Sequence, residues 1–233
     1  MRNIAILIIS AALSATYAGA LSHAQTEGFD VKTPVQTISD NSSKLINEIS
    51  ADAKKDPKTS IPRNAICSAE CYLVIPSIQV VSGRDDFAGT GLLGCRHADS
   101  GKLAPPVFFQ IANLGSFNES GGGLVILVMD RVGVKSVLGD QLQLTSGNTG
   151  SGIVGSEADV KNLKSFVAYA RPAGEAIQAF DASGSALVYD SGDTFNAYQQ
   201  ELEPIDIMLL SIDVPPALRD FASSLGDLRK GCK

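Results

Sequence analysis

Residues able to perform acid–base or nucleophilic chemistry are scarce in this chain, which contains only two histidines, His23 and His97. A nucleophile needs a base beside it, and His97 lies near Asp99 in a polar stretch typical of a hairpin turn. The carboxylates Asp190 and Asp193 lie beside glycine and are likewise interpreted as turn formers. The sequence therefore predicts that the protein is not an enzyme.

Two motifs resemble metal and nucleotide sites but lack the context that such sites need. Cys67 and Cys71 have the spacing of half a metal site, yet no second cluster of Cys or His completes it. The segment Gly89–Gly94 matches Gly-x-Gly-x-x-Gly, but a helix must open at the third glycine to hold a pyrophosphate, and Cys95 and Arg96 follow instead. We expect no metal and no cofactor, and we interpret these glycines as close packing inside a twisted strand.

A second glycine-rich region extends from Gly147 to Gly155, and Gly121 to Gly123 form a shorter one. Glycines at this density allow successive backbone N–H groups to turn inward and hold an anion. They equally allow a strand to bend or another backbone to approach closely. Both interpretations stay open at this stage.

The N-terminus has the features of a secretory signal peptide. Arg2 precedes the apolar run Ile4 to Leu13, which is well short of the ~20 residues that cross a bilayer, and small residues follow. We place cleavage after Ala24, so that residues 1–24 are the signal peptide, with cleavage after Ala20 as the alternative site. An uncleaved N-terminal anchor is the other alternative. The expected location is therefore periplasmic or secreted, with the protein peripheral to a membrane where it binds one.

The net charge limits the partners that the protein can bind. The formal net charge is −6, and an acidic protein repels nucleic acid and anionic membranes at long range unless a local basic patch overrides the repulsion. We expect no nucleic-acid partner.

The four cysteines are expected to form disulfides in an oxidising compartment, with all three pairings open, and the last one could link the tail covalently to the domain. They are Cys67, Cys71, Cys95 and Cys232.

The first element after a flexible segment, residues 25–37, is predicted to be an amphipathic helix. Apolar residues recur at helical spacing from Ile38 onward, Asp40 or Ser42 is available as a cap, and Pro57 ends the run. A local cationic cluster follows at its downstream edge. Its members are Lys54, Lys55, Lys58 and Arg63. The helix is interpreted either as an ordinary core-covering helix or as one that touches a membrane.

Short apolar runs separated by turn residues then predict a series of strands. The runs are 72–76, 92–93, 107–111, 124–129, 142–144 and 186–189. A short helical turn is expected after Pro62, and helices are predicted at 130–138 and 156–170. Because closure removes exposed strand edges, we expect a single α+β domain with a curled or barrel-like antiparallel sheet flanked by helices.

The tail, residues 199–233, is expected to add a strand and an amphipathic helix. Ile205 to Ile212 is apolar and strand-like, and Pro215 can open a helix. That helix would align Leu218, Phe221, Leu225 and Leu228 along one stripe. The stripe is interpreted as packing onto the domain, with capture of a partner protein or contact with a membrane as the alternative.

In order, these pieces resemble the SYLF domain, also called the Ysc84-type domain. The resemblance spans residues 61–198, so that residues 38–198 are expected to form a SYLF-like domain, and its strength is the order of the motifs. They are Ile61-Pro62, the strand ending in Pro76-Ser77, Gly89-Thr90-Gly91 leading to Arg96, Pro106-Val107-Phe108, the run ending at Asp130, the glycines 147–155, Tyr169, Gly184-Ser185 and Asn196-Ala197-Tyr198. The chain departs from the family pattern at Leu103, where tryptophan is typical, at Gln79 or Val80, where a basic residue is typical, and at Ile153, where proline is typical.

The resemblance implies lipid binding without catalysis, with anionic head groups bound by eukaryotic members and actin bundling by fungal ones. Other available cations are Arg84 and Arg96. We predict the contact residues to be Lys54, Lys55, Lys58 and Arg63, with Ile61 entering the interface. The partner is therefore a lipid or membrane surface. The alternative is a protein-interaction or envelope-scaffold module that binds another protein through the tail, and a hydrolase is a third hypothesis.

Overall fold

Strand β1 (Cys71–Ile75) lies between β3 (Phe87–Cys95) and β5 (Gly123–Val128) and pairs antiparallel with both. All of its residues are buried, as its unbroken apolar sequence predicts. The computed structural model describes residues 33–81, 87–97, 100–115, 117, 121–139, 141–155, 157–210 and 212–232. These residues belong to one structural unit.

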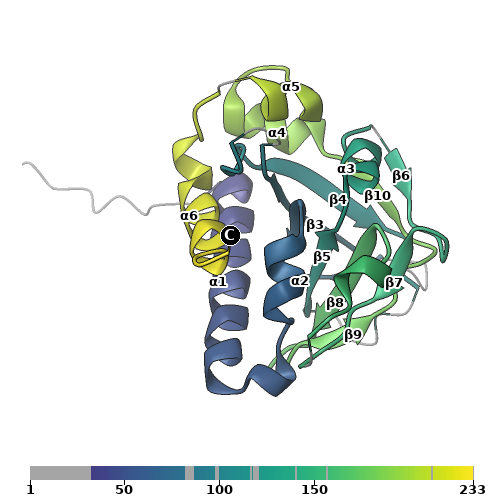
Figure 1. Ribbon diagram of the computed structural model, residues 1–233. Coiled ribbons are helices and arrows are strands. Elements are labelled where there is room, and N and C mark those ends of the chain that lie inside the picture. Colours follow the sequence, from purple (N-terminus) through teal and green to yellow (C-terminus); the bar gives the residue numbers. More distant parts are fainter. Residues whose placement is uncertain are drawn as a thin grey trace, which may run out of the picture. The chain divides into compact units, whose positions relative to one another are not determined.

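The strands of the described residues form a strongly curled sheet in the order β6–β10–β4–β3–β1–β5–β8–β7, with β2 paired to β3 and β9 to β8 (Figure 1). All pairings are antiparallel except that of β7 with β8. The remaining strands are β2 (Gln79–Val80), β4 (Val107–Ala112), β6 (Gln141–Gln143), β7 (Thr149–Ser151), β8 (Phe166–Arg171), β9 (Gln178–Phe180) and β10 (Ala186–Tyr189). The predicted fold class, an α+β domain with a curled sheet and flanking helices, is confirmed.

A layer of helices lies beside the sheet and consists of α1 (Pro34–Lys55), α2 (Arg63–Ser68) and α6 (Arg219–Leu228), as Figure 1 shows. α1 contacts both β1 and β3. Its buried face includes the small residues Ser39, Ser42 and Ser43, and the Ser42 hydroxyl donates to the backbone carbonyl of Val74 at 3.5 Å. Small side chains on this face therefore let α1 approach the backbone of the central strand closely.

The predicted amphipathic helix is present, but it begins earlier than the apolar pattern indicates. Thr33 caps it by accepting from the backbone N–H of Gln36, and Pro34 occupies the first turn, where its missing N–H costs nothing. Asp40 and Ser42 are therefore inside the helix and do not cap it. Of the segment expected to be flexible, residues 34–37 are helical, and residues 1–32, with the predicted signal peptide, lie outside the described residues.

Two secondary-structure predictions are wrong, and the first is the helix at 156–170. The structure has only a short 3₁₀ turn, η2 (Val160–Asn162), followed by strand β8; the proposed cap, Ser156, lies outside the described residues. The apolar spacing matched a helix, but β8 pairs with β5 along its full length and with β7 and β9 on its other edge. Tertiary pairing therefore overrode the local periodicity.

The second wrong prediction is the strand in the tail, where the structure has helix α5 (Pro204–Leu209). Pro204 occupies the first turn, and Glu203 and Asp206 form a reciprocal capping box. The apolar run hid these start signals. Helix α4 (Ser191–Tyr198) was also missed, because Asp190, interpreted as a turn former, accepts from the N–H of Asp193 and caps it.

The last helix follows its prediction. η3 (Pro216–Leu218) leads into α6, and the stripe packs onto the domain, since Leu218 and Phe221 are fully buried and Leu225 is 1% exposed. A Cβ added at Gly94 would lie 2.4 Å from Leu225 Cδ2. The glycine in β3 therefore gives α6 the room to lie against the sheet.

Glycines in β3 pack closely, as predicted. A Cβ at Gly91 would lie 2.1 Å from the carbonyl oxygen of Val74, and one at Gly89 would lie 2.5 Å from that of Ser77. The match of this segment to a nucleotide fingerprint therefore reflects the close approach of two backbones. The remaining helices are η1 (Pro57–Thr59) and α3 (Arg131–Val137), the second at its predicted place and capped by Asp130.

Two disulfides join the four cysteines. Cys71 and Cys95 are direct cross-strand partners in β1 and β3, and Cys67 pairs with Cys232. The prediction that Cys232 links the tail covalently to the domain is thus confirmed. Because Cys67 and Cys71 belong to different disulfides, neither thiolate is available to a metal in this state. Disulfides fit an exported protein, and none of the described helices is long and apolar enough to cross a membrane.

Candidate functional site

A groove of ≈ 940 Å³ lies where the C-terminal half of α1, the start of α2 and the end of α6 meet. One backbone hydrogen bond and one side-chain amide connect the segments at this groove. Gly155 N–H donates to the carbonyl of Ser60 at 2.9 Å, and the Asn64 amide both donates to and accepts from the backbone of Ala158, at 2.6 and 3.1 Å. The segment around 155–158 is therefore tied to the start of α2.

Apolar side chains from separate elements line this groove. Ile61 and Pro62 precede α2, Ile66 lies within it, and Leu228 ends α6. Ile61 was predicted to enter a membrane interface, but it is 3% exposed. It therefore contributes to the wall of the groove and does not project from the surface.

The predicted cations divide between the groove and its surroundings. Lys54 and Arg63 line it. Lys55 borders a separate cavity of ≈ 290 Å³ beside Arg171. Lys58 lies on η1, and its backbone packs closely on Gly155, since its carbonyl oxygen would be 1.9 Å from a Cβ added there. The structure thus brings two of the four cations together with Ile61.

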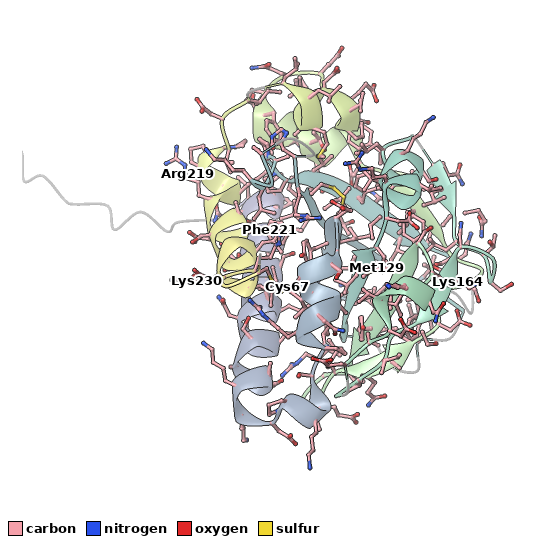
Figure 2. All side chains as sticks on the ribbon, viewed as in Figure 1. Cys67, Met129, Lys164, Arg219, Phe221 and Lys230 are labelled. Atoms are coloured by element: carbon pink, nitrogen blue, oxygen red, sulfur yellow. A yellow bond between two sulfur atoms is a disulfide. The ribbon has the colours of Figure 1, made fainter. Side chains whose placement is uncertain are left out.

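Lys230 is a groove residue that the sequence did not single out. It follows α6, and Figure 2 shows it beside the end of that helix, in the region of Cys67. Nothing local distinguishes it from other surface lysines. Only the disulfide between Cys67 and Cys232 signals that the end of the chain lies near α2.

Arg63 has a structural role in addition to its place in the groove. Its two terminal nitrogens, Nη1 and Nη2, donate to the backbone carbonyls of Leu228 and Lys230. These carbonyls lie at the C-terminus of α6, where no intrahelical donor remains for them. Arg63 therefore holds the end of α6 against α2 and closes one side of the groove.

The groove has a mixed charge. Lys54, Arg63 and Lys230 are its cations, and Glu157 and Asp227 are its carboxylates. Lys54 and Lys230 are both exposed. The protein as a whole is acidic, with a formal net charge of −6. The three cations of the groove are therefore a local positive group, and their attraction for an anion acts only at short range.

The other cations are engaged elsewhere. Arg96 forms an ion pair with Glu70 at 2.7 Å, and Arg171 on β8 bridges Glu48 and Asp52 of α1 at 2.8 and 3.0 Å. Arg84 lies outside the described residues.

The glycine region has a structural explanation. The N–H groups of Gly121, Gly152 and Gly155 donate to backbone carbonyls of Ile78, Ala168 and Ser60, at 2.8, 3.0 and 2.9 Å. A Cβ at Gly152 would lie 2.1 Å from the ring of Tyr169. These donors are therefore occupied, and close packing is the interpretation that the structure supports.

The surroundings of three groups with catalytic potential, His97, Tyr72 and Tyr169, can be described. The backbone of His97 closes a turn, because its N–H donates to Lys102 and its carbonyl accepts from Gly101; Asp99 lies outside the described residues. Burial raises the pKa of Tyr169 to about 12 and also raises the pKa of Tyr72, so both phenols are even harder to ionise than a free tyrosine. Among the residues that the structure describes, no group of three or more His, Cys, Asp or Glu side chains could hold a metal ion.

Comparison with known proteins finds no family model that matches the chain and no curated protein that is a significant match.

Proposed function

We propose that this protein binds lipid or a membrane surface without catalysing a reaction, and that the groove between α1, α2 and α6 is the contact site. One observation carries the proposal: aliphatic side chains and exposed cations line the same groove. An amphiphile offers the matching pair of features, an apolar chain and an anionic or zwitterionic head group.

The size and lining of the groove support this proposal. Ligand sites commonly enclose about 300–1,000 Å³ and combine apolar walls with a few polar groups, and this groove has ≈ 940 Å³ with Ile61, Pro62 and Leu228 beside Lys54 and Lys230. The resemblance to SYLF domains implies the same function, and its Ile61-Pro62 motif lines the groove. We further propose export through the predicted signal peptide, which the disulfides fit.

The alternative function, capture of a partner protein through the tail, has to use residues other than the tail stripe. Leu218, Phe221 and Leu225 are buried against the domain. A partner could reach that stripe only by displacing α6, which the disulfide to Cys67 and the hydrogen bonds from Arg63 oppose.

Vesicle sedimentation tests the proposal. The protein lacking residues 1–24 should pellet with vesicles that contain anionic lipid, and Lys54→Glu combined with Lys230→Glu should weaken binding at least about thirtyfold, because each reversal removes an attraction worth ~1 kcal/mol near the surface and adds repulsion. Lys164→Glu is the matched control, since Lys164 is exposed and lies away from Lys230 (Figure 2).

Native mass spectrometry of the same preparation identifies any small molecule that is carried through purification. A retained lipid would support the proposal and name the ligand. Absence of sedimentation with neutral, anionic and mixed vesicles, together with absence of retained lipid, would overturn it.

A further inference from the structure

Helices α4 and α5 present large apolar side chains to the surface. Phe195 on α4 is 45% exposed, and Ile205 and Leu209 on α5 are 42% and 74% exposed. Leu210, directly after α5, is 52% exposed. Figure 1 shows both helices at the same end of the domain. We call these four residues the α4–α5 surface; a group of this kind marks an interaction site more often than a single exposed leucine does.

Local contacts hold both helices firmly, so this exposure does not come from fraying. Ile207 and Met208, on the opposite side of α5, are buried, and the capping box fixes its start. α4 is held by the buried Thr194 and by Tyr198, whose hydroxyl donates to the carbonyl of Pro106 at 2.7 Å. The α4–α5 surface is therefore preorganised for a partner.

The charges that this segment of the chain contributes have one sign. No Lys or Arg occurs between Arg171 and Arg219. The acidic residues of this part of the chain near the two helices are Asp190, Asp193, Glu201, Glu203, Asp206 and Asp213. The backbone N–H of Asp193 donates to the Asp190 carboxylate at 3.0 Å, so two of these acidic residues lie together at the start of α4.

Two further carboxylates, Glu203 and Asp206, lie at the start of α5. Burial raises the pKa of Tyr189, whose hydroxyl donates to the carbonyl of Leu202, and the carboxylates of Glu203, Asp190 and Asp206 raise it further. The helix caps of α4 and α5 are thus close enough to act on one phenol. Carboxylates of both helix caps therefore lie beside the α4–α5 surface.

A hollow of ≈ 470 Å³ adjoins this surface. Asn196 and Gln199 line it from α4 and Pro215 and Pro216 line it from the segment before α6. Gln199 is the C-cap of α4, and Phe195 is the sequence neighbour of Asn196 in that helix. An apolar side chain of a partner that packs on Phe195 can therefore extend into the hollow.

We propose that the α4–α5 surface binds a cationic amphipathic segment of a partner protein. Apolar side chains of that segment would cover Leu209 and Leu210, while its Lys or Arg residues pair with the exposed carboxylates of Glu201 and Asp213. Charge complementarity selects this occupant. An anionic bilayer is repelled by the same carboxylates, and in a two-fold dimer each acidic surface would face its own copy.

Binding of a designed peptide tests this proposal independently of the lipid groove. The probe is a helical peptide with Leu on one face and Lys on the other, labelled for fluorescence anisotropy, and the comparison probe has Glu in place of every Lys. The Lys peptide should bind at least about tenfold more tightly than the Glu peptide. Raising the salt from about 0.05 M to about 0.5 M should weaken that preference, because screening shortens the reach of the carboxylates.

Variants then locate the binding site. Leu209→Ser with Leu210→Ser should weaken binding of the Lys peptide about tenfold, and Glu201→Lys with Asp213→Lys should abolish its preference over the Glu peptide. Val132→Ser is the apolar control, since Val132 on α3 is 70% exposed, and Glu175→Lys, at an exposed position outside the groove, is the charge control. Both controls should bind as the unaltered protein does.

Three outcomes would overturn the proposal. They are equal binding of the two peptides, loss of binding in the controls alone, and self-association in sedimentation velocity that Leu209→Ser dissolves, which would make a second copy the occupant. Vesicle binding serves as a separate readout. Its loss in the Leu209→Ser variant would assign the surface to a membrane instead.

Discussion

Cys67 and Cys232 are 165 positions apart in the sequence, and a disulfide holds their Cα atoms at 5.1 Å. Cys67 lies in α2 and Cys232 follows α6, so the bond joins the last helix to the first part of the domain. The same two segments contribute Arg63 and Lys230 to the groove that we propose as the lipid site. The two ends of the described domain are thereby made parts of one surface.

Replacing both cysteines of this bond, Cys67→Ser with Cys232→Ser, should lower the free energy of unfolding by about 2–4 kcal/mol, because a long closed loop restricts the unfolded chain most. Urea denaturation without reductant measures the change. The same change at Cys71 and Cys95, 24 positions apart, is the matched comparison and should cost less on loop entropy alone. An unaltered urea midpoint in the first variant would contradict the assigned pairing.

Gly91→Ala should destabilise the domain by about 1–3 kcal/mol, since the new Cβ would lie 2.1 Å from the Val74 carbonyl oxygen and the backbone cannot yield cheaply. Gly226→Ala is a control that should change stability in the opposite direction. Gly226 lies in α6 with nothing within 4 Å of an added Cβ, so alanine should stabilise the helix by about 0.5–1 kcal/mol. Thermal unfolding of both variants checks the two signs together.

Tyr169→Phe should change the dependence of stability on alkaline pH. Burial raises the pKa of Tyr169 from 10.0 to about 12, so the folded state keeps its proton after the unfolded state has lost it. The contribution of the protonated Tyr169 to the free energy of unfolding is fully present below pH 10. It falls as the pH rises toward 12, by up to about 1.4 kcal/mol per pH unit. Urea titrations between these pH values should show a shallower decline for Tyr169→Phe. Parallel curves for the two proteins would contradict the raised pKa.

Arg171→Met should loosen the contact between β8 and α1, because the Arg171 guanidinium bridges Glu48 and Asp52 and its side chain is 17% exposed. Loss of these charge-assisted bonds should cost about 1–3 kcal/mol of unfolding free energy. The neighbouring pair Lys44–Glu48 is the surface comparison, and Lys44→Met should change stability by about 0.5 kcal/mol or less. Equal effects of the two variants would show that Arg171 contributes only as a surface charge does.

Filling the groove should remove lipid binding while the fold is retained. Ala53 lines the groove from α1, and Ala53→Trp should reduce retained lipid about tenfold by occupying space that the ligand needs. Ala176→Trp adds the same bulk at an exposed position outside the groove and is the control. Unchanged lipid retention in Ala53→Trp, with a native circular dichroism spectrum, would place the lipid elsewhere.

Several elements could be predicted because their signals are local. The strand at Cys71–Ile75 is an unbroken apolar run that is buried on both faces, α3 starts at the cap Asp130, and the stripe of α6 has helical spacing. Where two local signals compete, the sequence misleads. The spacing of apolar residues before β8 mimics a helix, and the apolar run of α5 conceals its capping box.

Sequence alone also determined the general character of this protein: an α+β domain with a curled sheet, four cysteines suited to an oxidising compartment, and few residues able to do catalysis. Tertiary structure decided the disulfide pairing and the composition of the groove. Lys54 and Arg63 are near neighbours in sequence, but Lys230 joins them only because α6 packs on α1 and its end is bonded to Cys67. Contacts between such distant residues depend on the packing of whole elements, and a local pattern carries no trace of that packing.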